Sequence, residues 1–281
     1  MNAIYDSLVN NNASVSFFNA VGLPRLAPYW PRVFAVAAIF EIIFRLAAFF
    51  TPIVFPSTWG RLKKAERYKW CVRVASSTHA VYMVTRVLVI ISNSKLRSNP
   101  LHGFDQVAET VYSVTVGYFL WDIIDTYKNI DINGIGFMAH AVMSFGVYLL
   151  SYTPLLQYYG ACFMMFEVST IFLNFHFFLE DLGLQNAIMY LINGIALVSS
   201  FFFARVVYGT IISINVWKLI ANSEIPINPF VANFIRLSNL TLMGLSYYWF
   251  SIIIMSAKRK PLDADLSRAL DEMDKPESKA K

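Results

Sequence analysis

The sequence predicts an all-α protein, a polytopic membrane bundle of about seven transmembrane helices. Hydrophobic residues make up 57% of the 281 residues and charged residues only 15%, whereas a soluble domain usually has about 25% charged residues. The apolar residues are concentrated in long runs, and about 20 consecutive apolar residues are enough for a helix to cross a bilayer. Phe and Tyr, which are common on lipid-facing and interfacial surfaces, occur 24 and 15 times.

Seven apolar runs are expected to span the membrane, and prolines separate several of them. Pro56 follows the first run, Pro154 opens the fifth, and Pro226 and Pro229 lie in the loop before the seventh. The sixth run is longer than a perpendicular crossing needs, so we expect it to tilt or to extend beyond the membrane. In order, the expected spans cover residues 33–55, 68–92, 110–127, 133–152, 155–179, 187–219 and 232–257.

The spans divide the chain into four parts. We expect a lumenal N-terminal segment at residues 1–32, a first transmembrane helix at 33–56, a six-helix domain at 61–257 and a cytosolic tail at 258–281. The first 12 residues have neither a basic stretch nor a long apolar stretch, so the first span is expected to serve as signal anchor. Apolar residues at near-helical spacing between Leu262 and Met273 leave two readings of the tail, a short amphipathic helix or a disordered charged segment.

The distribution of Lys and Arg predicts the orientation. The loop after the first span contains Arg61, Lys63, Lys64, Arg67 and Lys69, and with seven spans it shares a side with the basic tail. The positive-inside rule places that side in the cytosol and the N-terminus in the lumen. A glycosylation sequon at Asn12 would then be lumenal. The net charge of +5 is explained by topology, and no nucleic-acid partner is expected.

Ionisable side chains inside the apolar runs are the main functional signal. His79, Asp122, His140, Glu167 and Arg205 each lie within a run that is otherwise long enough to span the bilayer. A charged side chain at that depth costs about 2.5–3.5 kcal/mol on insertion scales, so such groups face a protein interior or a wet cavity. Because they occur on separate spans, we expect them to share one polar chamber.

Spacing of three or four residues extends several of these positions into polar stripes on one helix face. The stripes predict a lipid-binding cavity formed by His79, Tyr82, Tyr118, Asp122, His140, Ser144, Glu167, Thr170, Asn174 and Arg205. For each residue the alternative is a purely structural role, in which it holds helices together and does not contact a lipid. Asp122 would then pair with Arg86 or Arg205 to hold helices together, as Glu41 and Arg45 are expected to do at i, i+4.

Metal and cofactor chemistry has no sequence support. The histidines do not form an H-x-x-x-H or H-x-x-E-H pattern, and a phosphate-binding Gly-rich loop and a serine-nucleophile elbow are also missing from the sequence. The two cysteines, Cys71 and Cys162, lie within apolar runs and are expected to be buried free thiols. We therefore predict neither a metal site nor a cofactor.

Five short motifs on successive spans resemble the TLC-domain family, which includes ceramide synthases, translocon-associated membrane proteins and a group of small lipid-related proteins. The residues in these motifs are more similar to those of the small TLC-domain proteins than to those of the synthases. The matching segments are Ser76-Ser77-Thr78-His79-Ala80, Gly117-Tyr118-Phe119-Leu120-Trp121-Asp122, Gly136-Phe137-Met138-Ala139-His140, Phe166-Glu167-Val168-Ser169-Thr170 with Asn174, and Asn193-Gly194 followed by Arg205.

The resemblance implies a six-helix TLC core around a central cavity, one additional N-terminal helix, residence in the endoplasmic reticulum and a lipid or acyl-chain ligand. Ceramide synthases carry a catalytic histidine pair on the span that corresponds to the fourth one, and here the pair reads His140-Ala141. A homeobox-like segment, present in many animal synthases, is also missing from the sequence. These departures favour lipid binding in homeostasis, sensing or transport, with membrane lipids as partners.

Two other functions are compatible with parts of the sequence. A ceramide-synthase-like acyltransferase would use His140 as general base, with Asp122 and Glu167 in support, and acyl-CoA and a sphingoid base as substrates. Seven spans with a lumenal N-terminus also fit a receptor, but the third span does not end in Asp-Arg-Tyr and the seventh has no Asn-Pro-x-x-Tyr. Neither the oligomeric state nor the identity of the lipid follows from the sequence.

Overall fold

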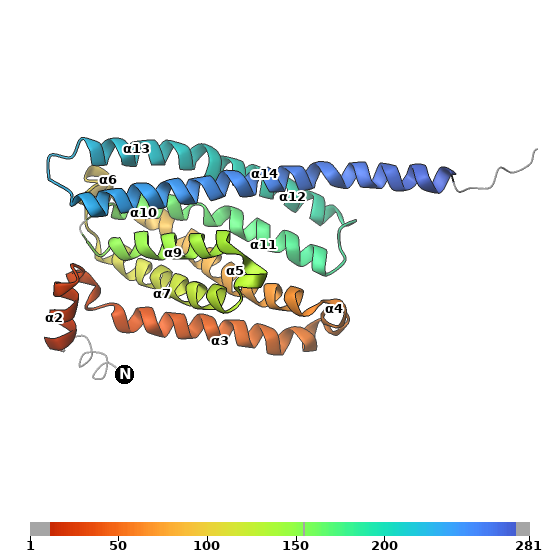
Figure 1. Ribbon diagram of the computed structural model, residues 1–281, viewed down its shortest axis with the longest axis horizontal. Coiled ribbons are helices and arrows are strands. Elements are labelled where there is room, and N and C mark those ends of the chain that lie inside the picture. The colour runs from red at the N-terminus through yellow and green to blue at the C-terminus, as the bar shows by residue number, and fades with distance from the viewer. Residues whose placement is uncertain (1–11, 154, 274–281) are drawn as a thin grey trace, which may run out of the picture.

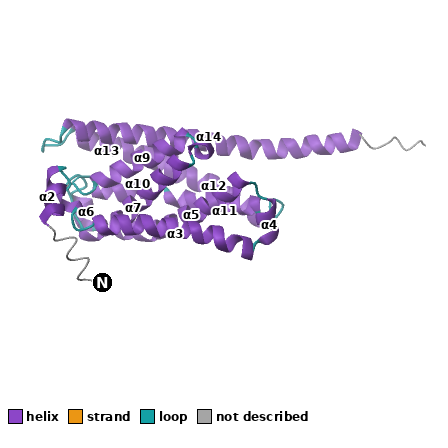
Figure 2. Cartoon of the chain, turned by 60° about the horizontal axis from the view of Figure 1, so that its bottom comes forward, coloured by secondary structure: helices purple, strands orange, loops and turns teal. Residues whose placement is uncertain are grey.

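A computed structural model describes residues 12–153 and 155–273, with side chains described as far as Ala257. Every regular element in the described part of the chain is helical, and the long helices run side by side along one axis (Figures 1 and 2). Five of them, at residues 30–54, 64–91, 157–181, 188–221 and 229–257, are long and apolar enough to cross a membrane. The predicted fold class, an all-α polytopic membrane bundle, is therefore confirmed.

Among the described residues, the long helices form seven passes along the bundle, and successive passes alternate in direction (Figure 1). These passes are α3 (Trp30–Val54), α5 (Lys64–Ile91), α7 (Gln106–Lys128), α9 (Ile135–Leu150), α10 (Gln157–Met164) with α11 (Glu167–Asp181), α12 (Ile188–Ser200) with the π-helix η2 (Phe201–Tyr208) and α13 (Gly209–Ala221), and α14 (Pro229–Met273). The connecting segments contain α2 (Asn12–Ala20), η1 (Pro24–Leu26), α4 (Pro56–Arg61), α6 (Ser94–Ser98) and α8 (Ile130–Asn133).

Two of the expected spans are not single regular α-helices. The fifth is divided at Met165 and Phe166 into α10 and α11, and the sixth contains η2 in its middle. Neither interruption is caused by a proline within it, and π-helical turns are frequent at functional sites. The apolar runs therefore predict where the passes lie but not where their backbone changes.

Helix α7 lies at the centre of one half of the bundle, and more than half of its residues are buried. It packs closely against α3 at Gly117, where an added Cβ would lie 2.7 Å from the carbonyl oxygen of Val33. Because protein surrounds α7, its polar residues avoid lipid. This explains how the third expected span accommodates two aspartates, Asp122 and Asp125.

The two halves of the bundle are packed differently. The filled half, formed by α3, α5 and α7, contains most of a large apolar cluster centred on residues such as Met83, Val87 and Val116, which have no exposed surface. The hollow half, formed by α10, η2, α13 and α14, has only a small buried cluster, which includes Val216 and Ile235. Helix α9 lies between the halves and contacts both α7 and α14.

The tail begins as a direct continuation of α14, whose helical backbone runs without a break from Pro229 to Met273 and extends well past the bundle (Figure 1). The side chains of Leu262, Leu266 and Leu270 lie outside the described part of the chain, so the predicted amphipathic face stays a prediction.

Candidate functional site

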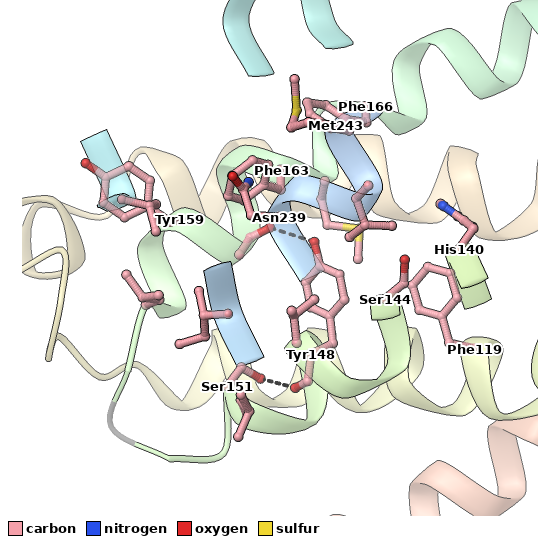
Figure 3. Close-up of a pocket in the computed structure, with 18 of the residues that line it drawn as sticks. Phe119, His140, Ser144, Tyr148, Ser151, Tyr159, Phe163, Phe166, Asn239 and Met243 are labelled. Carbon is pink, nitrogen blue, oxygen red and sulfur yellow. Dashed lines mark hydrogen bonds between the residues drawn. The ribbon is translucent and has the colours of Figure 1, made fainter. Parts of the chain in front are cut away.

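A cavity of about 110 Å³ lies in the hollow half, between α9, α10, α13 and α14. Figure 3 shows Tyr159 and His140 at opposite sides of this cavity, with Tyr148 between them. The Tyr148 hydroxyl donates to the carbonyl oxygen of Gly160 at 3.0 Å and so ties α9 to α10. The cavity is therefore an elongated space whose walls come from several separate passes.

One end of the cavity is apolar. Its lining includes Leu150, Leu156, Val216 and Ile235, which belong to or pack against the same small apolar cluster as Tyr159. Leu156 adopts a left-handed backbone conformation with φ of 58°, which is uncommon for a residue other than glycine. Such strain is found preferentially at ligand sites and mobile elements. This end suits a hydrocarbon chain, because most of its lining side chains are aliphatic.

The other end carries three ionisable side chains, His140, Glu167 and Arg205, together with Ser144. They come from α9, α11 and η2, and His140 and Glu167 each interact electrostatically with Arg205. The sequence predicted that groups from separate spans would share a chamber, and the structure brings these four residues together at one cavity.

The π-helix and two hydroxyls position Arg205. Its Nε donates to Ser169 Oγ at 2.8 Å and its Nη2 to Thr170 Oγ1 at 2.9 Å. The guanidinium also lies 5.4 Å from the ring centre of Phe166 and 5.1 Å from that of Phe201. Arg205 is only 7% exposed, yet no carboxylate oxygen of the described residues lies within 4.0 Å of it.

The interruption between α10 and α11 positions Glu167 at the first residue of α11. The Thr170 hydroxyl one turn later interacts with this carboxyl as well as with Arg205. Gly209 allows Phe166 to approach the start of α13, because a Cβ there would lie 2.7 Å from the end of the Phe166 ring. The two interruptions of the long helices, at Met165 and Phe166 and in η2, therefore both occur at the polar end of the cavity.

His140 packs edge-on against two aromatic rings, with centroid distances of 5.8 Å to Phe119 and 5.5 Å to Trp249. It also interacts electrostatically with His79. His79 is 1% exposed, stacks on Tyr118 at 4.0 Å, and has no hydrogen-bond partner for either ring nitrogen. His79 and Tyr118 belong to the filled half and do not line the cavity.

The remaining predicted site residues also pack away from the cavity surface. Asn174 donates to Ser76 Oγ and Ser77 Oγ, both at 3.1 Å, and so joins α11 to α5. Tyr82 lies beneath the Arg86 guanidinium, 5.6 Å from it. Thr170 reaches the site only through the side chains that it contacts. His79 and Asn174 are buried against neighbouring helices, whereas Arg86, on the same face of α5 as His79, is exposed.

Asp122 does not form the ion pair with Arg86 or Arg205 that is expected if its role is purely structural. It accepts a hydrogen bond from Thr126 Oγ1 at 3.4 Å, and among the described residues it has no ion pair with Arg86 or Arg205. By contrast, the expected pair of Glu41 and Arg45 is confirmed at 2.7 Å. Cys71 and Cys162 are buried free thiols, as predicted.

No site residue is predicted on α14, but this helix contributes Asn239, Met243 and Ser246 to the cavity. A signal was present, because Asn239 and Ser246 are seven residues apart, close to two helical turns. The Asn239 side chain donates to Ser213 Oγ at 2.9 Å and accepts from Trp217 Nε1 at 3.0 Å, which fixes α14 against α13. In the part of the chain that the structure describes, no cluster of side chains could hold a metal ion.

Comparisons with known proteins agree with the motifs on these helices. The family model of the TLC domain matches residues 69–255. An uncharacterized TLC domain-containing protein of Schizosaccharomyces pombe is 28% identical over 248 residues, which cover 87% of this chain and 84% of that protein. Topoisomerase I damage affected protein 4 of Saccharomyces cerevisiae is 29% identical over 205 residues, 67% of this chain and 72% of that protein. TLC domain-containing protein 4 of Homo sapiens is 24% identical over 173 residues, 59% and 65% of the two chains.

Proposed function

Because the chain belongs to the TLC-domain family, we propose that it binds a lipid or acyl chain in its intramembrane cavity and acts in lipid homeostasis, sensing or transport. The observation that carries this proposal is the cavity itself, which has an apolar end and a polar end with His140, Glu167 and Arg205. An amphiphile with one polar head satisfies both ends. A uniformly polar or uniformly apolar ligand satisfies only one.

The volume of the cavity limits what can enter it. Pockets that enclose a whole drug-sized ligand measure about 300–1,000 Å³, whereas an engineered cavity of about 150 Å³ holds a benzene molecule. A cavity of about 110 Å³ is smaller than both, so only part of a lipid fits inside it and the rest of the molecule must extend out of it. We propose a single-chain ligand rather than a whole two-chain phospholipid.

We further propose residence in the endoplasmic reticulum membrane, with the N-terminus in the lumen and the C-terminus in the cytosol. The loop containing Lys63 and Lys64 and the end of α14 from which the tail continues lie at the same end of the bundle (Figure 1). That shared basic end supports the orientation given by the positive-inside rule. Asn12, which is exposed at the start of α2, is the proposed glycosylation site, and a glycosidase-sensitive mass shift lost in Asn12→Gln tests it.

The test of lipid binding is mass spectrometry of lipids extracted from protein purified in a mild detergent. We expect single-chain lipid above the level found in empty detergent micelles. Ser144→Leu, which adds bulk at a buried position of the lining, should remove that lipid. Val142→Leu adds bulk on an exposed face of the same helix and should leave it unchanged. Wild-type protein without lipid above background would refute the proposal.

One observation supports a second candidate function: His140 and Glu167 line the same cavity. In a ceramide-synthase-like acyl transfer, His140 would take the proton of an attacking amine. The amine nitrogen would form a bond to the acyl carbon, the carbon–sulfur bond of acyl-CoA would break, and the proton would pass to the released thiolate. Asp122 does not line the cavity, so it would not contact a substrate bound there. Product from acyl-CoA and a sphingoid base that is lost in His140→Ala would favour this function.

A further inference from the structure

Arg205 has unused hydrogen-bonding capacity directed at the cavity. A guanidinium has five N–H donors, and among the described residues only its Nε and Nη2 have partners, Ser169 and Thr170. The Nη1 atom has no hydrogen-bond partner among the described residues, yet it does not belong to the fully buried polar atoms that lack one. Nη1 therefore keeps some accessible surface, and Arg205 lines the cavity. Removing a charge from water without a partner costs several kcal/mol. Arg205 therefore has donors available for an anionic group in the cavity, in addition to its electrostatic interaction with Glu167.

Glu167 has the complementary arrangement. It lines the same cavity, and neither of its oxygens is within 4.0 Å of Arg205 or of another cationic side chain of the described residues. The Thr170 hydroxyl interacts with both side chains and so bridges them. The Glu167 carboxylate and the Arg205 guanidinium thus line one cavity without forming a direct ion pair.

A second arginine shows that the bundle closes such pairs where no cavity intervenes. Arg73 and Asp181 join α5 to α11 with a distance of 2.7 Å between Nη1 and Oδ2, and both side chains are 17% exposed. Asp181 lies on the same helix as Glu167. The open geometry of Arg205 and Glu167 is therefore a local property of the cavity and not a general feature of charge pairs in this protein.

We propose that the cavity recognises a zwitterionic single-chain lipid, with Arg205 binding its phosphate and Glu167 binding its ammonium group. Guanidinium groups match phosphate oxygens in geometry and charge, and a carboxylate accepts hydrogen bonds from an ammonium. A purely anionic head would leave Glu167 unpaired beside it, and a purely cationic head would do the same to Arg205. The single chain extends toward the apolar end near Leu156 and Val216. This inference rests on the proposed lipid-binding function and names its ligand class.

The experiment compares four lipids of similar chain length on the purified, delipidated full-length protein. The probes are oleoyl-lysophosphatidylethanolamine (zwitterionic), oleoyl-lysophosphatidic acid (anionic), sphingosine (cationic) and monooleoylglycerol (uncharged), and native mass spectrometry measures their binding. We expect the zwitterionic lipid to bind at least about tenfold more tightly than the other three, which is about one charge-assisted hydrogen bond.

Charge-neutral variants test each contact separately. Glu167→Gln should weaken binding of the zwitterionic lipid about tenfold or more and strengthen binding of the anionic one, which reverses the preference. Arg205→Gln should weaken both phosphate-bearing lipids, and Arg205→Lys, which keeps the charge, should recover part of the affinity if the first variant folds poorly. Arg86→Gln removes a charge at an exposed position of α5 and should change neither the affinity nor the preference.

The outcomes separate the two proposals. Wild-type protein that binds none of the four probes would overturn both the lipid-binding function and the zwitterion assignment. Equal binding of all four, or a preference that Glu167→Gln and both Arg205 variants leave unchanged, would overturn the zwitterion assignment while the lipid-binding function stands. Preference for the anionic probe by wild-type protein would likewise overturn it.

Discussion

Two groups of buried polar residues, one in the filled half and one in the hollow half of the bundle, differ in whether their side chains are joined by direct contacts. In the filled half, Asp125 accepts a hydrogen bond from the Tyr68 hydroxyl at 2.5 Å, and Asn133 donates to that hydroxyl at 2.7 Å. In the hollow half, Arg205 and Glu167 line a cavity and interact electrostatically, but among the described residues neither makes a direct ion-pair contact. An ionisable residue in an apolar run therefore indicates only that its side chain faces the protein interior. An ionisable residue that lines a cavity without a direct ion pair indicates a candidate binding site.

Gly117 offers the largest expected effect and tests how tightly the filled half is packed. In Gly117→Ala the new Cβ would meet the backbone oxygen of Val33 at 2.7 Å, so α3 and α7 must move apart. Overpacking typically costs about 1–3 kcal/mol, and a backbone neighbour places this variant at about 3 kcal/mol. Thermal unfolding in detergent measures it.

The matched control for that glycine is Gly244 on α14, where nothing lies within 4 Å of an added Cβ. Gly244→Ala should be neutral or should stabilise the protein by about 0.5–1 kcal/mol, because alanine favours the helix. Equal destabilisation by the two variants would contradict the contrast in packing.

Asp125 comes next, because it tests the satisfied polar network. Asp125→Ala removes the acceptor of the Tyr68 hydroxyl and leaves a partly buried donor without it, at a cost of about 2 kcal/mol. Asp131→Ala, at an exposed position of α8, should have almost no effect. A chemical-denaturation series on both variants provides the measurement, and the prediction fails if Asp125→Ala is as stable as its control.

Gly209 is expected to tolerate alanine better than Gly117, although both distances to the nearest atom are 2.7 Å. The neighbours of Gly209 are the far ends of the Phe166 and Met243 side chains, which border the cavity and can shift into it. We expect a cost below about 1 kcal/mol, because a relaxed contact stays under the usual overpacking range. The same thermal assay applies, and a cost equal to that of Gly117→Ala would show that the hollow half is as rigid as the filled half.

The smallest effect on stability is expected for Ser144→Leu, which should nevertheless abolish lipid binding. The added side chain fills open volume beside His140 and buries apolar surface, so the free energy of unfolding should change by less than about 1 kcal/mol in either direction. Unfolding measured after removal of bound lipid checks this. Strong destabilisation would mean that this part of the lining is already packed.

Part of the site was predictable because its physical signal is strong. His140, Glu167 and Arg205 stand out as ionisable residues in apolar runs, and the cost of exposing them to lipid requires that they face inward. His79 and Asn174 give the same signal, but they pack into helix contacts away from the cavity. Sequence periodicity assigns a residue to the inner face of its helix, and it does not tell which inner contact that face will make.

The sequence alone determined that this chain is a helical membrane bundle, which segments form its passes and which polar residues avoid lipid, because these properties follow from apolar run length and desolvation cost. Only the tertiary structure decided that α10 and α11 separate before Glu167, that η2 carries Arg205 and that α14 closes the cavity. These features depend on how side chains from distant passes fit together. That fit determines which polar groups find a partner and which remain open to a ligand.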